Sequence, residues 1–105
     1  MKSIYELDEI LSELEEDKES YFVDFLNTEN VEAGIIRLRK DQKDTQTAHS
    51  VDEIYHVIEG EGLISIQARN YAVKKGTCIF VPANVEHNFH GNKSDLTVFY
   101  VLTGK

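Results

Sequence analysis

The feature that most constrains this chain is the rhythm of short apolar stretches that begins at Tyr21. From there on, stretches rich in Val, Ile, Phe and Tyr alternate with turn residues every eight to twelve positions or so, which is typical of an antiparallel sandwich or barrel. The longest apolar runs, such as residues 78–81 and 98–102, are far below the ~20 residues of a membrane-spanning helix. Strands are predicted near residues 21–26, 32–39, 53–59, 62–68, 71–73, 77–81, 87–90 and 96–102, with tight turns at residues 59–62 and at Arg69 and Asn70.

A helix is predicted ahead of the strands. Ser3 and Glu6 have the spacing of a capping box. Apolar residues follow one another at steps of three and four positions, namely Ile4, Leu7, Leu11 and Leu14. This periodicity predicts an amphipathic helix over residues 3–16. Because a chain of 105 residues normally builds one core, we expect a helical extension over residues 1–20 and a single β domain over residues 21–105.

The chain is acidic, with 19 Asp and Glu against 11 Lys and Arg and a formal net charge of -8 at pH 7. Such a field repels nucleic-acid phosphates and anionic lipid head groups, so neither nucleic-acid nor membrane partners are expected. The single cysteine, Cys78, excludes an internal disulfide framework, and the N-terminal residues lack the apolar segment of a signal peptide. We therefore expect a cytoplasmic protein, in which Cys78 is a small buried packing group.

Three residues, His49, Glu53 and His87, are candidates for a metal site. Two imidazoles and one carboxylate form the ligand set of a facial triad, which leaves positions on a divalent metal open for other ligands. A straight strand would separate His49 from Glu53 by about 13 Å, so the chain must bend between them, and residues 50–52 can supply the bend. The alternative, a helix that places both on one face as in zinc peptidases, is disfavoured by the β-branched and aromatic run at residues 54–58.

The spacing around these residues resembles the two conserved motifs of the cupins. In the first motif a histidine precedes a glutamate, and a glycine follows after six more residues. The residues that match are His49, Glu53 and Gly60 for the first motif, and Gly76, Pro82 and His87 for the second. Both motifs occur in the correct order with a short segment between them. Residues 32–102 therefore resemble a small single-domain cupin of the cupin 2 conserved barrel type.

Three positions depart from these motifs. Thr47 stands where the first motif has the first of two histidines, Asn84 where the second has a glycine, and Gly91 where the second has an asparagine. Asn84 is expected to keep the turn, because asparagine tolerates left-handed backbone better than other residues with a Cβ. The change at Thr47 removes one of the four ligands that such proteins often carry.

The resemblance implies an all-β fold, a double-stranded β-helix or jelly-roll barrel whose ligand cavity lies inside its mouth. A divalent metal (Fe, Mn, Ni or Zn) would be held by His49, Glu53 and His87. Gln46 could add an amide oxygen as a fourth ligand if a local twist aims it inward. We expect the protein to lose metal below the free-histidine pKa of about 6.5.

Several functions are compatible with such a site. A redox metal would let dioxygen and an enolate, phenolate or thiolate substrate bind together, as in a small dioxygenase. Zinc or nickel would act as a Lewis acid in an isomerase or a hydrolase. The alternatives are a barrel that has lost its metal and a non-catalytic module that binds or senses a small metabolite. Tyr55 and Tyr100 are the further acid–base candidates, although Tyr55 is expected mainly to fill the core.

The remaining histidines are expected outside the site. His56 lies three residues after Glu53, so on an extended strand it faces away from the cavity. His90 is out of phase with His87 and is expected to be solvated. Apolar groups are expected to point outward at Ile54, Ile58 and Ile64. Together with free strand edges, these groups predict a homodimer. The resemblance to cupins, whose cavity lies inside the barrel, implies a small-molecule ligand or substrate.

Overall fold

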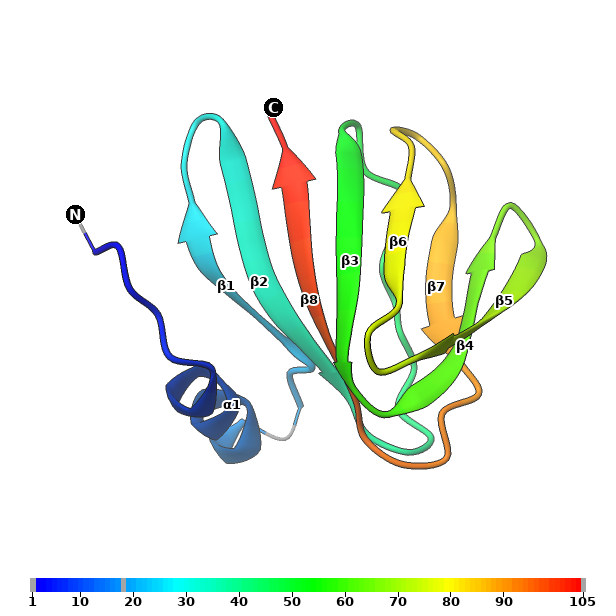
Figure 1. Ribbon diagram of the computed structural model, residues 1–105, viewed down its shortest axis with the longest axis horizontal. Coiled ribbons are helices and arrows are strands. Elements are labelled where there is room, and N and C mark those ends of the chain that lie inside the picture. Colours follow the sequence, from blue (N-terminus) through cyan, green and yellow to red (C-terminus); the bar gives the residue numbers. More distant parts are fainter. Residues whose placement is uncertain (1, 18, 105) are drawn as a thin grey trace.

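A computed structural model describes residues 2–17 and 19–104 of the chain (Figure 1). One helix precedes the strands, in the order α1 (Leu7–Glu16), β1 (Phe22–Asn27), β2 (Val31–Leu38), β3 (Asp52–Glu59), β4 (Glu61–Ile66), β5 (Arg69–Lys74), β6 (Cys78–Val81), β7 (His87–His90) and β8 (Leu96–Thr103). Every predicted strand is present. Met1 and Lys105, the outer limits of the two predicted segments, and Lys18 lie outside the described residues, so the division at residues 1–20 and 21–105 stays a prediction.

The strands form two antiparallel sheets that enclose a core between them (Figure 1). The larger sheet has the order β1-β2-β8-β3-β6, and the smaller one has the order β5-β4-β7. Along β3 the side chains alternate between buried and exposed, with Glu53, Tyr55 and Val57 facing inward. The fold is the predicted jelly-roll barrel with an N-terminal helix.

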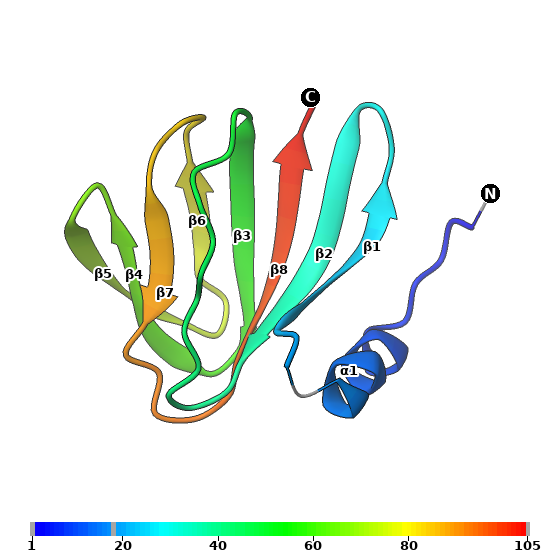
Figure 2. The same ribbon diagram turned by 180° about the vertical axis from the view of Figure 1, so that it is seen from behind.

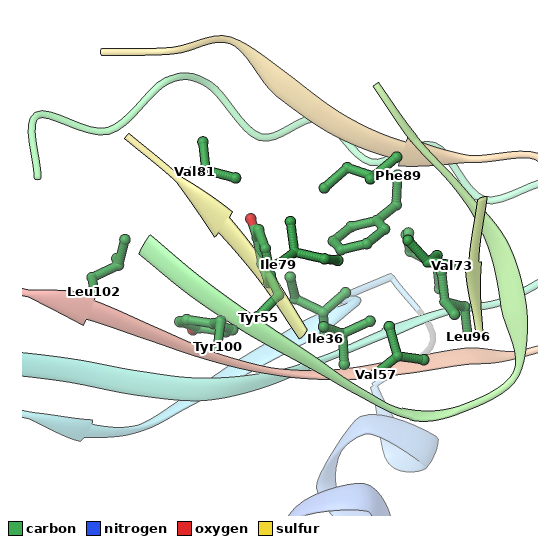
Figure 3. Close-up of a cluster of buried hydrophobic side chains, with 13 residues drawn as sticks. Ile36, Tyr55, Val57, Val73, Ile79, Val81, Phe89, Leu96, Tyr100 and Leu102 are labelled. Atoms are coloured by element: carbon green, nitrogen blue, oxygen red, sulfur yellow. The ribbon is translucent and has the colours of Figure 1, made fainter. Parts of the chain in front are cut away.

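The apolar core fills one end of the barrel. In Figure 3, Val73 and Leu96 lie at one end of the cluster, and Tyr100 and Leu102 lie at the opposite end. Leu102 on β8 pairs with Glu53 on β3. Polar inward-facing groups therefore begin where the apolar cluster ends, near the start of β3.

Helix α1 packs on the outer face of the larger sheet. Its buried residues Ile10 and Leu14 pack in one cluster with Ile35 of β2, as an amphipathic pattern predicts. Arg39 Nη2 donates a hydrogen bond to the Leu14 carbonyl at 2.8 Å and satisfies one carbonyl of the last turn. Within the described residues, no helix combines the length and the apolar character needed to cross a membrane.

The predicted start of this helix at Ser3 is wrong. The helix begins at Leu7, and its N-cap residue Glu6 makes no side-chain capping hydrogen bond. Ile4 is 71% exposed, so it gains no packing that would hold a helical turn at residues 3–6, although Tyr5 contacts the Phe25 ring. A capping box contributes only about 1 kcal/mol, and a short helical turn without tertiary packing is not stable in water.

Strand alternation corrects two predictions of burial. Cys78 is exposed rather than buried, because Ile79 and Val81 take the inward positions of β6. Ile64 is buried in the core rather than outward-facing. In both cases the phase of the strand decides the burial of the side chain, and residue type does not.

The predicted turn at Arg69 and Asn70 lies two residues earlier. Gln67 and Ala68 have positive φ angles of 50° and 65°, and Ile66 pairs with Arg69 across the hairpin. Two consecutive residues of positive φ are typical of the two-residue turns that match the twist of the flanking strands. Neither residue is a glycine or an asparagine, so the turn carried no sequence signal.

The connection from β2 to β3, residues 39–51, runs along the molecule between β7 and β3 (Figure 2). The Phe89 backbone N–H of β7 donates to Asp44 Oδ2 at 2.8 Å, and the Asn92 amide donates to the carbonyls of Leu38 and Arg39. These bonds hold the connection against β7. Its last residues, which include His49, therefore lie at the polar end of the barrel.

Candidate metal centre

His49, Glu53 and His87 meet at this polar end. One ligand atom of each residue lies within 4.8 Å of the other two. Glu53 Oε1 is 3.0 Å from His87 Nε2 and 3.6 Å from His49 Nε2. Two ligands at right angles around an ion, with bonds of about 2.1 Å, are about 3 Å apart. The three residues could therefore hold a metal ion.

Each of the three side chains comes from a different segment. Glu53 occupies an inward position of β3 and is 1% exposed. His87 is the first residue of β7, in the opposite sheet, and is also buried. His49 precedes β3, and 30% of its side chain is exposed. The cluster thus spans both sheets and is open to solvent on the side of His49.

The chain bends at residues 50–51, as the spacing of His49 and Glu53 requires. The Asn84 N–H donates to the His49 carbonyl at 2.6 Å, and the Ala83 N–H donates to Asp52 Oδ1 at 3.0 Å. Asn84 has a φ of 65°, so it adopts the left-handed backbone expected of a residue in the glycine position. The turn between β6 and β7 therefore holds both ends of the bend.

The hydrogen bonds around the cluster leave acceptor atoms without donors. His87 Nδ1–H donates to the Val85 carbonyl at 2.9 Å, so in the neutral ring Nε2 is the ligand atom. With the His87 proton on Nδ1, His87 Nε2 donates no hydrogen bond to Glu53 Oε1, although the two atoms are 3.0 Å apart. Among the described residues, His49 Nε2 and Glu53 Oε1 are then buried without a hydrogen-bond partner. Buried polar atoms almost always have partners, and a cation between these atoms would provide one. The donor set therefore fits a divalent metal.

The electrostatics of the cluster couple metal binding to protons. Burial lowers the pKa of His87, but Glu53, the Val85 carbonyl and Asp44 outweigh burial, and the net effect raises the pKa. A metal must displace the proton that His87 retains, so metal affinity falls as the pH falls. Burial raises the pKa of Tyr55, and Glu53 acts in the same direction, so the Tyr55 hydroxyl stays protonated.

Tyr55 both fills the core and makes hydrogen bonds at the site. Its hydroxyl donates to Gln46 Oε1 at 3.1 Å and lies 2.9 Å from His87 Nε2. Gln46 Nε2 in turn donates to Asp44 Oδ2 at 3.0 Å, a link that the sequence did not reveal. To bind a metal, the Gln46 amide oxygen would have to leave Tyr55, and its role as a fourth ligand stays a prediction.

A cavity of about 420 Å³ adjoins His49 and Glu53. Thr47, which replaces a histidine of the first motif, is among the residues that line it. Because residues 39–51 form no strand, neighbouring positions need not face opposite sides, and Gln46 lines the same cavity.

Other lining residues come from β1, β2 and β8, and they include Asp24, Glu32 and Tyr100. Sequence reasoning missed Asp24 and Glu32, because only the pairing of β1 with β2 and of β2 with β8 brings them beside the site. The alternation along β2 was the one available signal, since it places Glu32 on the same face as Ile36.

Two histidines lie outside the cluster. His56 is exposed on the outer face of the larger sheet, as predicted. His90 is half-buried, and its Nε2 lies 2.8 Å from Asn70 Oδ1. Both are therefore suitable controls for experiments on the three candidate ligands.

Comparison with known proteins decides the family. Residues 34–104 match Cupin_2, the family of cupin domains. The chain is a cupin. This cupin is 32% identical over 99 residues to an uncharacterized protein of Streptomyces coelicolor, with 94% of this chain and 93% of the relative covered.

Solved structures share the fold of this cupin. The plu4264 protein of Photorhabdus luminescens superposes with a TM-score of 0.67 at 26% identity, covering 79% of this chain and 69% of that one. The Cnp3 cupin domain of Schizosaccharomyces pombe gives 0.72 at 14% identity, with 80% and 64% covered. The DMSP lyase DddQ of Ruegeria pomeroyi gives 0.68 at 15% identity, with 74% and 40% covered. The last two similarities show the fold alone.

Proposed function

We propose that this cupin holds a divalent metal through His49, Glu53 and His87 and binds a small organic ligand from the adjoining cavity. The observation that carries the proposal is the pair of buried atoms, His49 Nε2 and Glu53 Oε1, that have no hydrogen-bond partner among the described residues although they lie next to a third ligand atom. Three protein ligands leave positions on a six-coordinate ion for the organic ligand.

The chain's own residues prepare this site. The Val85 carbonyl keeps the proton of His87 on Nδ1, so Nε2 is available as a ligand atom. The Gln46 side-chain amide is held at both ends, because its nitrogen donates a hydrogen bond to Asp44 and its oxygen accepts one from Tyr55. Ile36 and Leu102 add apolar surface to the cavity wall beside Glu53 and exclude water from that side of a bound ligand.

We propose dioxygenation as the reaction class. Two histidines and one carboxylate are the ligand set of non-haem iron oxygenases, in which iron supplies the redox chemistry that joins dioxygen to a bound substrate. An enolate, phenolate or thiolate fits such a site, because an anionic donor atom is a good ligand for the ion.

A second candidate is a metal-dependent binding module without turnover. The observation that favours it is the state of two tyrosines, Tyr55 beside His87 and Tyr100 at the cavity wall. Tyr55 is held protonated by burial, and the Tyr100 hydroxyl donates to Asp24. Tyr55 is therefore not ready to act as a base near neutral pH, and the Tyr100 hydroxyl already has a hydrogen-bond partner. Oxygen uptake by the iron-loaded protein with small enolic, phenolic and thiol compounds supports the dioxygenase, and tight binding without uptake supports the module.

The test of the metal site is a titration of protein purified without a histidine tag. Calorimetry with zinc, manganese and iron(II) is expected to show one ion per chain. His49→Ala, Glu53→Gln and His87→Ala are each expected to weaken binding by at least about tenfold, by analogy with what even outer-shell changes cost. The matched control is His56→Ala, which removes an exposed histidine from the same strand as Glu53. Unchanged affinity in Glu53→Gln, or a loss in His56→Ala, would contradict the proposal.

A further inference from the structure

One aromatic side chain on the inner face of the larger sheet is left uncovered. Phe22 on β1 pairs with Ile36 on β2, and the same row continues through Val98 on β8 to Val57 on β3. Ile36, Val98 and Val57 are at most 1% exposed, whereas Phe22 is 46% exposed. The smaller sheet lies on the opposite side of the molecule from β1 (Figure 1). It therefore leaves the β1 end of this row open.

The uncovered ring faces the cavity that adjoins the candidate metal centre. Phe22 and Tyr21 both line this cavity of about 420 Å³. Consecutive residues of a regular strand point to opposite faces, but Tyr21 precedes β1, so both rings can face the same space. Aromatic surface that lines a concave space is typical of sites for small molecules. The cavity thus has an aromatic end.

Tyr21 fixes the arrangement of this aromatic end. Its hydroxyl donates to Asp44 Oδ1 at 3.4 Å and accepts a hydrogen bond from the Thr45 N–H at 3.2 Å. The Phe22 ring packs against the Tyr21 ring at an angle of 63°, with 5.5 Å between the ring centroids, which is a favourable geometry for two aromatic rings. The exposed ring of Phe22 therefore packs on a neighbour that is itself bonded to the connection between β2 and β3.

The aromatic end lies well away from the metal centre along β2. Glu32 on β2 belongs to the row of Glu53, because both pair with Leu102. Ile36, four residues further along β2, belongs to the row of Phe22. Four residues of a strand span about 13 Å. A ligand that reaches from the metal to the aromatic end must therefore be elongated, on the order of 10 Å or more.

We propose that the ligand of this cupin is an elongated molecule with a metal-binding head and an apolar tail that packs on Phe22. This inference rests on the proposed metal site. Packing of the tail removes the exposed surface of the Phe22 ring from water, which favours binding. Phe22 thus selects ligands by the length and polarity of the tail, whereas the metal selects the head.

Two hydroxamates test the contribution of the tail, because their two oxygen atoms bind zinc and the tail can be varied alone. Acetohydroxamate has a single methyl group as its tail, and octanohydroxamate has a linear alkyl chain. Each is titrated by calorimetry into zinc-loaded protein, whose zinc content is measured first. Burying one methylene group contributes roughly a factor of four in affinity. Octanohydroxamate is therefore expected to bind at least about tenfold more tightly than acetohydroxamate.

Variants assign this gain to Phe22. Phe22→Ala is expected to lower the ratio of octanohydroxamate to acetohydroxamate affinity at least about threefold. Zinc affinity is expected to stay unchanged, because β2 and β8 separate β1 from the strand of Glu53. The matched control is Tyr71→Ala, since Tyr71 is 48% exposed and also lies on an edge strand, β5. If Phe22→Ala does not fold, Phe22→Thr removes the ring and inserts a residue that favours strands.

The outcomes separate the two proposals. If zinc binds but octanohydroxamate binds no more tightly than acetohydroxamate, or neither of them binds, this inference is overturned and the metal site stands. The inference is also overturned if the gain persists in the Phe22 variant, or if Tyr71→Ala loses it equally. If the wild-type protein takes up no zinc, the metal site is overturned and the inference falls with it.

Discussion

Replacing Glu53 by methionine is expected to stabilise the metal-free protein and to abolish metal binding. Glu53 is 1% exposed, and its Oε1 has no hydrogen-bond partner among the described residues. An ionised carboxylate in this environment is poorly solvated. Replacing a whole buried ion pair by apolar groups is often neutral or stabilising by about 1–4 kcal/mol, whereas removing one partner destabilises the protein if the other charge stays buried. The partner here is His87, whose Nε2 is 3.0 Å from Glu53 Oε1. Burial has the largest influence on the pKa of His87 and lowers it, so without Glu53 the ring is expected to be neutral at pH 8. Methionine keeps the unbranched shape of glutamate, so we expect a gain in unfolding free energy of about 1 kcal/mol.

The gain is expected to increase with pH. Burial lowers the pKa of His87, but Glu53 helps to raise it overall. A pKa raised in the folded state stabilises the protein fully below the unfolded value of about 6.5, and this contribution is lost as the pH rises through the folded value. The metal-free wild type therefore loses stability above pH ~6.5, whereas the variant lacks the carboxylate that raises the pKa of His87.

Thermal unfolding of chelator-treated protein, followed by circular dichroism at pH 6 and pH 8, measures both effects. A gain of about 1 kcal/mol raises Tm by about 4–8 °C in a domain of this size. Zinc at one hundred times its Kd is expected to stabilise the wild type by about 2.7 kcal/mol and the variant not at all. Glu59→Met is the control on the same strand. If the metal-free variant is less stable than the wild type by about 1 kcal/mol or more at pH 8, Glu53 has a structural role and the reasoning is wrong.

Three further predictions follow from the same structure. Thr47→His is expected to tighten zinc binding about tenfold in calorimetry and to weaken the binding of small phenolic compounds to the zinc-loaded protein, because Thr47 lines the cavity; unchanged zinc affinity would show that position 47 does not face the metal. Gly34→Ala is expected to lower the unfolding free energy by about 2–3 kcal/mol, because its Cβ would overlap the Val23 carbonyl; a wild-type denaturant midpoint would contradict the packing described. Ile54 and Phe80 are paired across β3 and β6 and are 47% and 59% exposed, so we expect a homodimer through this face. Light scattering should report twice the 12.0 kDa chain mass, reduced to the monomer mass by Phe80→Lys; a monomeric wild type would refute the dimer.

The sequence predicted the strands well because their periodicity is a local signal. Inward and outward positions alternate along β3, so the burial of Glu53 and the exposure of His56 could be inferred from position alone. The spacing of His49 and Glu53 also required a bend, and the chain bends at residues 50–51. These inferences needed no knowledge of which strands are neighbours.

The parts that could not be predicted depend on packing between distant segments. The beginning of α1 is set by where the sheet offers apolar surface, so Ser3 and Ile4 stay outside the helix. Cys78 was expected to be buried from its residue type, but its phase on β6 places it outside. The position of Asp24 and Glu32 beside the cavity is set only when β1, β2 and β8 are paired.

Anomalous diffraction from a crystal loaded with cobalt or zinc at neutral pH would locate the bound ion. We expect one strong peak per chain, about 2.0–2.2 Å from His49 Nε2, His87 Nε2 and a Glu53 carboxylate oxygen. A peak at His56 or His90, or a fully occupied ion that contacts fewer than two of the three residues, would contradict this expectation.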